Sequence, residues 1–350
     1  MPLLYPAYPA IARLRRKLGF DKSLEHAATR TWVLQPAETR VERPALYDTR
    51  ELDRVTACQD DTSMSAELER LRGGPRHHGA TVAHLIPDVY LLEGHLFRRD
   101  ALRELSRTPL PWISGPIREE RGEASLAASR YGVRYFGHWM TDDLPTLKLA
   151  TDHAPPISPR VALTRHQTEY LTLTGLEYEM LPNAYLKQLI VFDDIAQNRL
   201  KALRYAALRE RFQAITSTLT EEPTPGVVLL RRNTGHQRVL TNEDQVAAAL
   251  RARGFRSLCP EEHSVSEILA ACRGARVAVG VEGSHLAHAI YTLAPGGSLV
   301  VLQPPQRFNN VFKDICDAAE LSYAMTVGHP DGDGFRVNID ALLRLVDRMR

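Results

Sequence analysis

The sequence predicts an α/β protein whose C-terminal part is a doubly wound, parallel, Rossmann-like sheet, and three observations support this fold class. From about residue 224 to 325, apolar strand patterns alternate with helical patterns of about ten residues, which is typical of a parallel sheet with helices on both faces. Within this region, residues 276–303 have the pattern of one β-α-β unit. The chain has 350 residues, more than one hydrophobic core usually holds, so we expect two domains.

Local signals bound the elements of this C-terminal region. Ser264 and Glu267 form a capping-box pattern that opens a helix, and Gly254 and Gly274 stand where helices are expected to end. Pro295-Gly296-Gly297 ends a further helix. In chain order, the expected elements are a strand at 227–230, a helix at 243–253, a strand at 255–259, a helix ending before Gly274, a strand at 276–280, a helix at 285–293 and a strand at 298–302.

The N-terminal part is less regular. It has a strand or hairpin pattern at 88–96 around Gly94, buried strand patterns at 160–163 and 189–192, and a long amphipathic helix pattern at 198–215. We therefore divide the chain into a partly irregular N-terminal extension (1–84), an α/β domain (85–220), a Rossmann-like domain (224–328) and a C-terminal segment (329–350). The helix pattern at 339–349 in that last segment could cross back onto the first domain.

Composition excludes several classes of protein. The chain is 44% hydrophobic and 25% charged, as in ordinary globular proteins, and its net charge of +2 argues against a nucleic-acid partner. No apolar run approaches the length of a membrane span. None of the four cysteines forms a CxxC pair, and Cys259, Cys272 and Cys316 lie in apolar patterns. We expect these three to be buried, in a protein of the reducing cytoplasm.

A basic run lies near the N-terminus, between residues 11 and 20. Its cations, from Arg13 to Lys17, follow the apolar residues rather than precede them, so the segment does not have the order of a signal peptide. Charge runs usually mark a solvated helix. The alternative is a short amphipathic helix that lies on an anionic membrane surface.

The turn of the β-α-β unit carries a polar cluster. Its members are Glu282, Gly283, Ser284, His285 and His288. Ligands of open parallel sheets bind at the carboxyl ends of strands, and amides at a helix N-terminus favour phosphate, so this turn is a candidate phosphate site. Glu282 could accept hydrogen bonds from ribose hydroxyls. The alternative is a tight strand–helix turn with His288 in the core.

Arg231, Arg232 and Asn233 follow the first strand of the same region. An arginine fork matches phosphate oxygens bidentately, so this second cluster could bind the same ligand. The alternative is an ordinary surface strand end.

A third cluster consists of His138, Asp142 and Asp143. His138 and Asp142 are four residues apart and would share one helix face, where a histidine or a carboxylate could accept a proton from a substrate hydroxyl. The alternative is a pair of aspartates facing water beside a histidine that bonds the backbone. Adjacent carboxylates are not a DxD motif, and we expect no metal site.

Taken together and in this order, three segments resemble glycosyltransferase family 61. They are FGHWMTDDLPTL, VVLLRRNTGHQRVLTNEDQVAAALRARGF and EEHSVSEILAACRGARVAVGVEGSHLAHAIYTLAPGG, and the resemblance covers about residues 134–303. Glu282, His285 and His288 stand where the family's closing block has His, Gly and Asn. This version of the block is closer to bacterial capsule-type members.

The resemblance implies a GT-B-like fold of two facing Rossmann-like domains with parallel sheets. It implies an inverting transfer from a nucleotide sugar, without a cofactor or an essential metal. The donor would lie near Arg231, Arg232, Gly283 and Ser284. A glycan or glycolipid acceptor would lie near His138, Asp142 and Asp143, with one of the two acids as base and the histidine positioning substrate.

The expected setting is the synthesis of a bacterial surface polysaccharide, in the cytoplasm or at the inner membrane face. Two other functions fit a similar architecture. One is a polysaccharide pyruvyltransferase, and the other is a nucleotide-sugar-binding protein of polysaccharide assembly that lacks catalysis.

Overall fold

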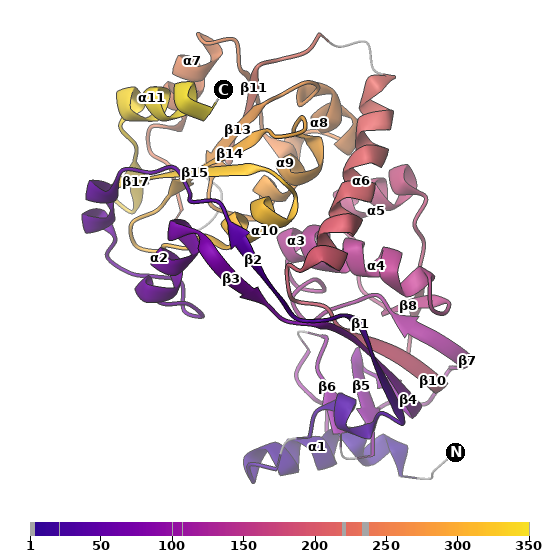
Figure 1. The fold of residues 1–350 in the computed structure, drawn as a ribbon. Coiled ribbons are helices and arrows are strands. Elements are labelled where there is room, and N and C mark those ends of the chain that lie inside the picture. Colours follow the sequence, from indigo (N-terminus) through magenta and orange to yellow (C-terminus); the bar gives the residue numbers. More distant parts are fainter. Residues whose placement is uncertain are drawn as a thin grey trace. The chain divides into compact units, whose positions relative to one another are not determined.

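The computed structural model describes residues 4–20, 22–99, 101–106, 108–218, 222–232 and 238–349. It divides the chain into two compact units. The first unit runs to Ala37 and resumes from Gly79 to Leu200, and the second contains Glu38–His78 and the chain from Lys201 onward. Both units are mixed α/β structures, which confirms the α/β class, whereas the GT-B-like arrangement of two facing domains stays a prediction (Figure 1).

The sheet of the second unit is fully parallel, as the sequence predicts. Its strands lie in the order β12-β11-β13-β14-β15. Their bounds are β11 Gly226–Leu229, β12 Arg256–Leu258, β13 Val277–Val281, β14 Ser298–Gln303 and β15 Ser322–Val327. This is the 2-1-3-4-5 order of doubly wound folds, in which the strand order reverses between β11 and β13. Ligands of such folds bind beyond the carboxyl ends of these two strands.

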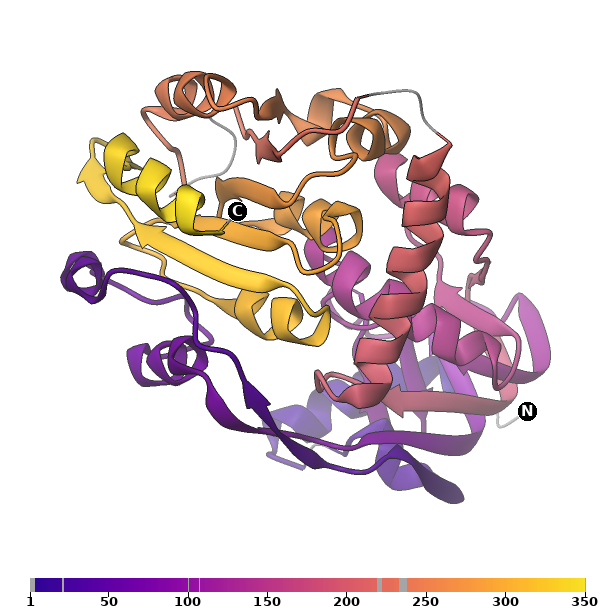
Figure 2. The same ribbon diagram turned by 45° about the horizontal axis from the view of Figure 1, so that its top comes forward.

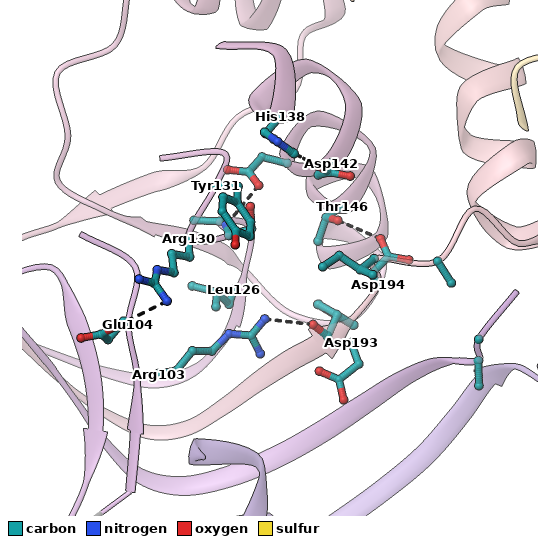
Figure 3. Close-up of a pocket in the computed structure, with 18 residues that line it drawn as sticks. Arg103, Glu104, Leu126, Arg130, Tyr131, His138, Asp142, Thr146, Asp193 and Asp194 are labelled. Carbon is teal, nitrogen blue, oxygen red and sulfur yellow. Dashed lines mark hydrogen bonds and ion pairs between the residues drawn. The ribbon is translucent and has the colours of Figure 1, made fainter. Parts of the chain in front are cut away.

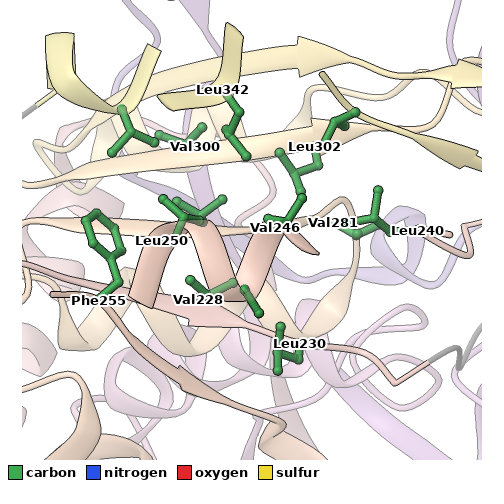
Figure 4. Packing of buried hydrophobic residues seen from close by; sticks show 14 of the residues in the cluster. Val228, Leu230, Leu240, Val246, Leu250, Phe255, Val281, Val300, Leu302 and Leu342 are labelled. Carbon is green, nitrogen blue, oxygen red and sulfur yellow. The ribbon is translucent and has the colours of Figure 1, made fainter. Parts of the chain in front are cut away.

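Two helices cover one face of this sheet, α7 (Glu243–Arg251) and α11 (Ile339–Met349). Leu250 of α7 and Leu342 of α11 are fully buried in one apolar cluster with Val300 of β14 (Figure 4). The predicted return of the terminal helix to the first domain is wrong. Its buried side chains recur at four-residue spacing, which gives α11 one apolar stripe, and that stripe packs within the second unit.

The other helices of the second unit are α6 Arg199–Ser217, whose first two residues belong to the first unit, α8 Val265–Ala271, α9 Ala287–Thr292 and α10 Val311–Ala318. Tyr205 and Phe212 of α6 pack against Tyr291 of α9, with ring centroids 6.1 and 5.5 Å apart. Arg209 of α6 donates to the carbonyl of Leu293 at 2.9 Å. These contacts hold α6 along α9.

Residues 38–78 complete the second unit although they precede most of the first. They form the hairpin of β2 (Glu38–Glu42) and β3 (Gly74–His78), a 3₁₀ turn (Thr49–Arg54) and α2 (Met64–Arg72), which lies beside α10 (Figure 2). The buried carboxylate of Glu51 accepts from the amide of Val327 at 2.9 Å. That of Glu67 accepts from the amide of Asn310 at 2.5 Å.

The sheet of the first unit is mixed. Its strands lie in the order β6-β5-β4-β10-β7-β8-β9, and β1 also pairs with β4. Strands β10, β7, β8 and β9 are parallel, whereas β4 runs antiparallel to its partners β1, β5 and β10. The bounds are β1 Arg30–Gln35, β4 Thr81–Leu92, β5 His95–Arg98, β6 Ala101–Arg103, β7 Glu119–Leu126, β8 Pro156–Pro159, β9 Glu179–Leu181 and β10 Ala184–Asp193.

Two of the predicted features of this sheet are confirmed and one is wrong. The hairpin around Gly94 joins β4 to β5, and the strand pattern at 189–192 falls inside β10. The predicted strand at 160–163 is irregular, and the strand β8 ends just before it. Parallel pairing with β7 places Pro156 and Ile157 in the ladder, and the prolines that bound β8 conceal this strand in the sequence.

The helical elements of the first unit are α1 Tyr8–Lys17, α3 Phe136–His138, the π-helical turn Trp139–Asp143, α4 Leu144–Thr151 and α5 Arg165–Thr174, with 3₁₀ turns at Tyr5–Ala7 and Leu24–Ala27. Within the described ranges of the chain, none of the helices has the length and apolar character needed to cross a membrane. The predicted burial of Cys259, Cys272 and Cys316 is confirmed, and each is a free thiol.

Candidate active site

A cavity of about 610 Å³ lies within the first unit, where the carboxyl ends of β7 and β10 meet the segment that carries the third sequence cluster (Figure 3). Leu126 and Phe192 form apolar wall, and the side chains of His138, Asp142 and Asp194 bring polar atoms to it. The combination of apolar walls with a few convergent polar groups is typical of ligand sites.

His138 and Asp142 form a hydrogen-bonded pair at this cavity. The His138 Nδ1 atom lies 2.8 Å from Asp142 Oδ2, and the two side chains are 42% and 19% exposed. Asp142 stands on the π-helical turn, a local widening that is frequent at functional sites. When Nδ1 is protonated and donates a hydrogen bond to the Asp142 carboxylate, the Nε2 atom of His138 has a free lone pair. This lone pair can accept a proton from a bound hydroxyl.

Asp143 lines the same cavity but is committed to the fold. Its side chain is 3% exposed, and its Oδ1 atom accepts a hydrogen bond from the amide of Ser129 at 3.0 Å. A Cβ atom at Gly132 would overlap this carboxylate, so the loop at 129–132 depends on Asp143. Of the two acids, Asp142 is therefore the one that pairs with His138 at the cavity, whereas Asp143 holds the adjacent loop.

The cavity also contains polar groups that the sequence reasoning missed. Asp194 accepts from the hydroxyls of Thr146 at 2.8 Å and Thr81 at 3.2 Å. Arg103 donates to the carbonyl of Phe192 at 3.2 Å. A signal for Asp194 was present, because it comes directly after the strand pattern at 189–192, at the carboxyl end where parallel sheets bind ligands.

A second candidate site lies in the second unit, at the reversal of strand order between β11 and β13. Three arginines converge there on Glu282, which follows β13 and is 5% exposed. Its carboxylate lies 2.9 Å from Arg238 and 2.6 Å from Arg307. Arg231, which follows β11, directs its guanidinium to the carbonyl of Glu282 at 3.4 Å. Glu261 and Glu243 also interact with the charge of Arg231, so carboxylates and guanidiniums are mixed at this edge.

Gly283 lets the chain approach these arginines closely. Its φ angle of 154° is disfavoured for other residues, and a Cβ atom there would lie 2.8 Å from Arg231 Nη1 and 3.1 Å from Arg238 Nη1. A side chain at this position would therefore press against the arginines that surround Glu282.

Glu243, at the first position of α7, holds the end of β11. Its carboxylate accepts from the amides of Arg231 and Arg232 at 2.7 and 2.9 Å. Burial, and then the nearby charge of Arg238, lowers the pKa of Arg231 from its ordinary value. The Arg232 side chain instead pairs with the exposed Asp244 at 2.9 Å. The two neighbouring arginines thus differ, and Arg231 is the one that joins the cluster around Glu282.

The remaining predicted residues of this site differ in exposure. Ser284 is exposed, whereas His285 and His288 are 7% and 1% exposed. Burial, followed by the charge of Arg231, holds the pKa of His285 well below its usual value, so its ring is neutral. His288 lies inside α9 and is buried, which agrees with the alternative that this histidine belongs to the core. Asn233 falls outside the described residues.

Arg238 and Arg307 were missed by the sequence reasoning. Arg307 had a usable signal, because it follows the end of β14 by four residues, at the same edge of the sheet as Arg231. Arg238 had none, since it lies in the loop between β11 and α7, far from any pattern of period two or 3.6. Across the described part of the chain, no group of three or more His, Cys, Asp or Glu side chains is arranged to hold a metal ion.

The second unit thus presents arginines at the carboxyl edge of a parallel doubly wound sheet, and the first unit presents a cavity with a histidine–aspartate pair. Residues 136–301 match the family model described as Glycosyltransferase 61. The matched stretch contains both His138 and Asp142 and most of the arginine cluster. This match confirms the resemblance to glycosyltransferase family 61 that the motifs predict, and it supports glycosyltransferase activity.

Other comparisons add little. No curated protein matches the chain. Among solved structures, the chain is similar to the crystal structure of an alcohol dehydrogenase from Thermotoga maritima, with 14% sequence identity and a TM-score of 0.21, over 47% of this chain and 51% of that one. The chain thus spans about half the length of that enzyme, and a likeness of this degree carries no argument.

Proposed function

We propose that the protein is an inverting glycosyltransferase that transfers a sugar from a nucleotide-sugar donor to a hydroxyl of a glycan or glycolipid acceptor. The observation that carries this proposal is the arginine cluster around Glu282 at the reversal of strand order. Doubly wound sheets bind their ligands at this point, and guanidiniums match phosphate oxygens. The setting that fits family membership is the synthesis of a bacterial surface polysaccharide in the cytoplasm.

The second unit is then the donor-binding domain of a GT-B-like enzyme. Arg231, Arg238 and Arg307 carry three positive charges around Glu282, and Glu261 and Glu243 also act on Arg231. A diphosphate needs compensation of its negative charge both when it binds and when it departs. The guanidiniums can supply it, so we propose that transfer does not require a divalent metal.

The first unit provides the acceptor site and the base. Because Asp142 is engaged by His138 Nδ1, we take the histidine as the base, and not one of the two acids as the family resemblance implies. The acceptor hydroxyl gives its proton to His138 Nε2, its oxygen bonds to the anomeric carbon of the donor sugar, and the bond from that carbon to the phosphate oxygen breaks. The electron pair leaves with the nucleotide, and attack from the opposite face inverts the anomeric centre. Asp142 keeps the proton of Nδ1 in place and stabilises the imidazolium that forms.

Ligand binding tests the donor site first. Thermal unfolding would be followed with UDP, GDP, CMP, dTDP, NAD and phosphoenolpyruvate, with EDTA and then with Mg²⁺, because a ligand that binds the native state raises its melting temperature. We expect one nucleotide to stabilise the protein without metal. The Arg238→Gln variant should lose this shift, whereas Arg253→Gln, an exposed arginine paired with Asp347, should keep it.

The rate of sugar transfer tests the role of the His138–Asp142 pair. With the nucleotide sugar so identified, Asp142→Asn should lower the transfer rate by about 10²–10⁴-fold and leave the nucleotide-induced shift intact. Stabilisation by phosphoenolpyruvate alone would point to a pyruvyltransferase instead. If a nucleotide raises the melting temperature but neither sugar transfer nor donor hydrolysis is detected, the protein is a nucleotide-sugar-binding protein without catalysis. If the rise in melting temperature requires Mg²⁺, the metal-independent mechanism is wrong.

A further inference from the structure

The first unit exposes a group of large apolar side chains at its N-terminal helix. Leu14 and Leu18 are 59% and 60% exposed, Phe20 is 66% exposed, and Trp112 and Ile113 are 64% and 74% exposed. We call these five residues the N-terminal surface. Large apolar side chains that gather at one place on a surface mark sites of interaction.

The helix α1 that carries this surface is firmly docked. On its inner side, Tyr8 and Ala12 are 5% and 4% exposed. The ring of Tyr8 packs edge-on against Tyr90 of β4, with centroids 5.5 Å apart, and Tyr5 stacks on the same ring at 5.6 Å. Figure 1 shows α1 lying across the end of the unit near β5 and β6. Leu14 and Leu18, four residues apart, therefore point outward from a fixed helix.

Contacts along the helix bring the two parts of the surface together. The Arg13 guanidinium lies 4.8 Å from the ring centroid of Trp112 and donates to the carbonyl of Leu110. In the 3₁₀ turn that precedes α1, the carbonyl of Pro6 accepts from the amide of Ser114 at 3.0 Å. The segment at 110–114 thus runs beside α1, and its Trp112 and Ile113 belong to the same exposed region as the leucines.

Positive charge surrounds these apolar side chains. The first twenty residues contain four basic residues, Arg13, Arg15, Arg16 and Lys17, and no acidic residue. Arg16 pairs with Glu104 at 2.9 Å, and Arg13 is engaged with Leu110 and Trp112. Long basic side chains beside exposed apolar ones can extend to lipid phosphates while their methylenes and the apolar groups enter the headgroup region.

We propose that the N-terminal surface docks the protein onto a membrane of anionic phospholipid. Charge selects this occupant over a second copy of the chain, because a twofold interface through this surface would bring the same cations face to face. Each basic residue near an anionic bilayer contributes about fivefold in affinity. None of the five residues of the N-terminal surface lines the cavity of the first unit, and docking would hold the enzyme where lipid-linked acceptors lie.

Vesicle co-sedimentation of the full chain tests the proposal. The probes are vesicles of phosphatidylcholine alone and of phosphatidylcholine with about 30% phosphatidylglycerol, at about 0.1 M salt. We expect binding to the anionic vesicles only. The triple variant Leu14→Ser, Leu18→Ser, Ile113→Ser should lose at least about tenfold in vesicle affinity, because each leucine or isoleucine forfeits apolar burial. Leu203→Ser is the matched control, since Leu203 is a helix residue that is 58% exposed.

Two further measurements keep the outcome clear. The melting temperature of the triple variant should equal that of the wild type, since all three side chains are exposed, and its nucleotide-induced shift should persist even if the membrane proposal fails. Binding that is absent, equal on neutral vesicles, or unchanged in the triple variant overturns the proposal. A dimer in light scattering that the triple variant abolishes would also overturn it, in favour of a second copy.

Discussion

Replacing Glu282 with glutamine should tighten anion binding at the arginine cluster while destabilising the ligand-free protein. Glu282 is 5% exposed, and its carboxylate lies between the guanidiniums of Arg238 and Arg307 at 2.9 and 2.6 Å. Glutamine keeps the shape of the side chain but removes its charge. The two cations lose their shared counter-ion, so the free energy of unfolding and the affinity for phosphate should change in opposite directions.

The size of each effect follows from the burial and the distances. Removing one partner of a buried ion pair costs about 3–5 kcal/mol, and because the amide oxygen still accepts a hydrogen bond, we expect about 2–3 kcal/mol here. For the ligand, a carboxylate about 6 Å from a phosphate repels it by about 3 kcal/mol at an effective dielectric constant of about 20. Solvent at the site would halve this value, which leaves about tenfold tighter binding.

Calorimetric titration with inorganic pyrophosphate and with UDP measures the affinity, and thermal unfolding without ligand measures the stability. Ionic strength is held constant, because the effect is electrostatic. Glu210→Gln is the control, since it removes an exposed carboxylate from α6 in the same unit. It should leave both quantities unchanged.

Two results would refute this reasoning. If pyrophosphate binds Glu282→Gln no more tightly than the wild type, the carboxylate does not compete with phosphate for the arginines. If UDP binding weakens while pyrophosphate binding stays the same, Glu282 accepts hydrogen bonds from the ribose, which is the alternative role that the sequence suggests.

Three further predictions concern single residues. Asp143→Asn should lower the melting temperature even without ligand, because its carboxylate holds the amide of Ser129; a stable but inactive variant would make Asp143 the base. Gly283→Ala should weaken nucleotide binding through contact with the arginines, whereas Gly296→Ala, which also has a positive φ but open space, should not, as the nucleotide-induced thermal shift would report. Burial raises the pKa of Asp317 to about 6, so the folded protein holds this proton longer than the unfolded chain does. Chemical denaturation should show that wild-type stability, relative to Asp317→Asn, falls by about 1–3 kcal/mol as pH rises from 4 to 6; a flat difference would contradict the shift.

Much of the second unit could be predicted because its elements carry local signals. The capping box of Ser264 and Glu267 forms in full, with both reciprocal hydrogen bonds, and α8 begins where this pattern placed it. Strands β13 and β14 are buried along their whole length, so each appears as an unbroken apolar run. The 2-1-3-4-5 strand order could not be predicted, because it depends on which strands pair across intervening helices.

The strands of the first unit were harder to predict from the sequence, because several of them are strands only through pairing with their neighbours. In β7, Glu119–Leu126, only the last three residues are buried, and the polar remainder is strand because it pairs with β10. The prolines of β8 argue against a strand unless the neighbouring strand is known. Such pairings join residues far apart in the chain, and no local pattern records them.

In the candidate sites, too, contacts between residues close in sequence could be predicted, and contacts between distant residues could not. The pairing of His138 with Asp142 could be predicted from their spacing on one helical face. The convergence of Arg238 and Arg307 on Glu282 could not, because those side chains come from loops that lie 44 and 25 residues away along the chain. Choosing between Asp142 and Asp143 also required the structure, since only burial and the bond to Ser129 distinguish the two neighbouring acids.

The division of the second unit between residues 38–78 and the chain from Lys201 onward has a consequence for synthesis on the ribosome. The buried carboxylates of Glu51 and Glu67 emerge long before their partners Val327 and Asn310. The early segment must wait, unpartnered, while the whole of the first unit is translated, whereas the strands and helices of the first unit can pack as soon as they appear. The second unit is therefore the last part of the protein to mature, and a ribosome that stalls before β15 releases a chain in which this unit is incomplete.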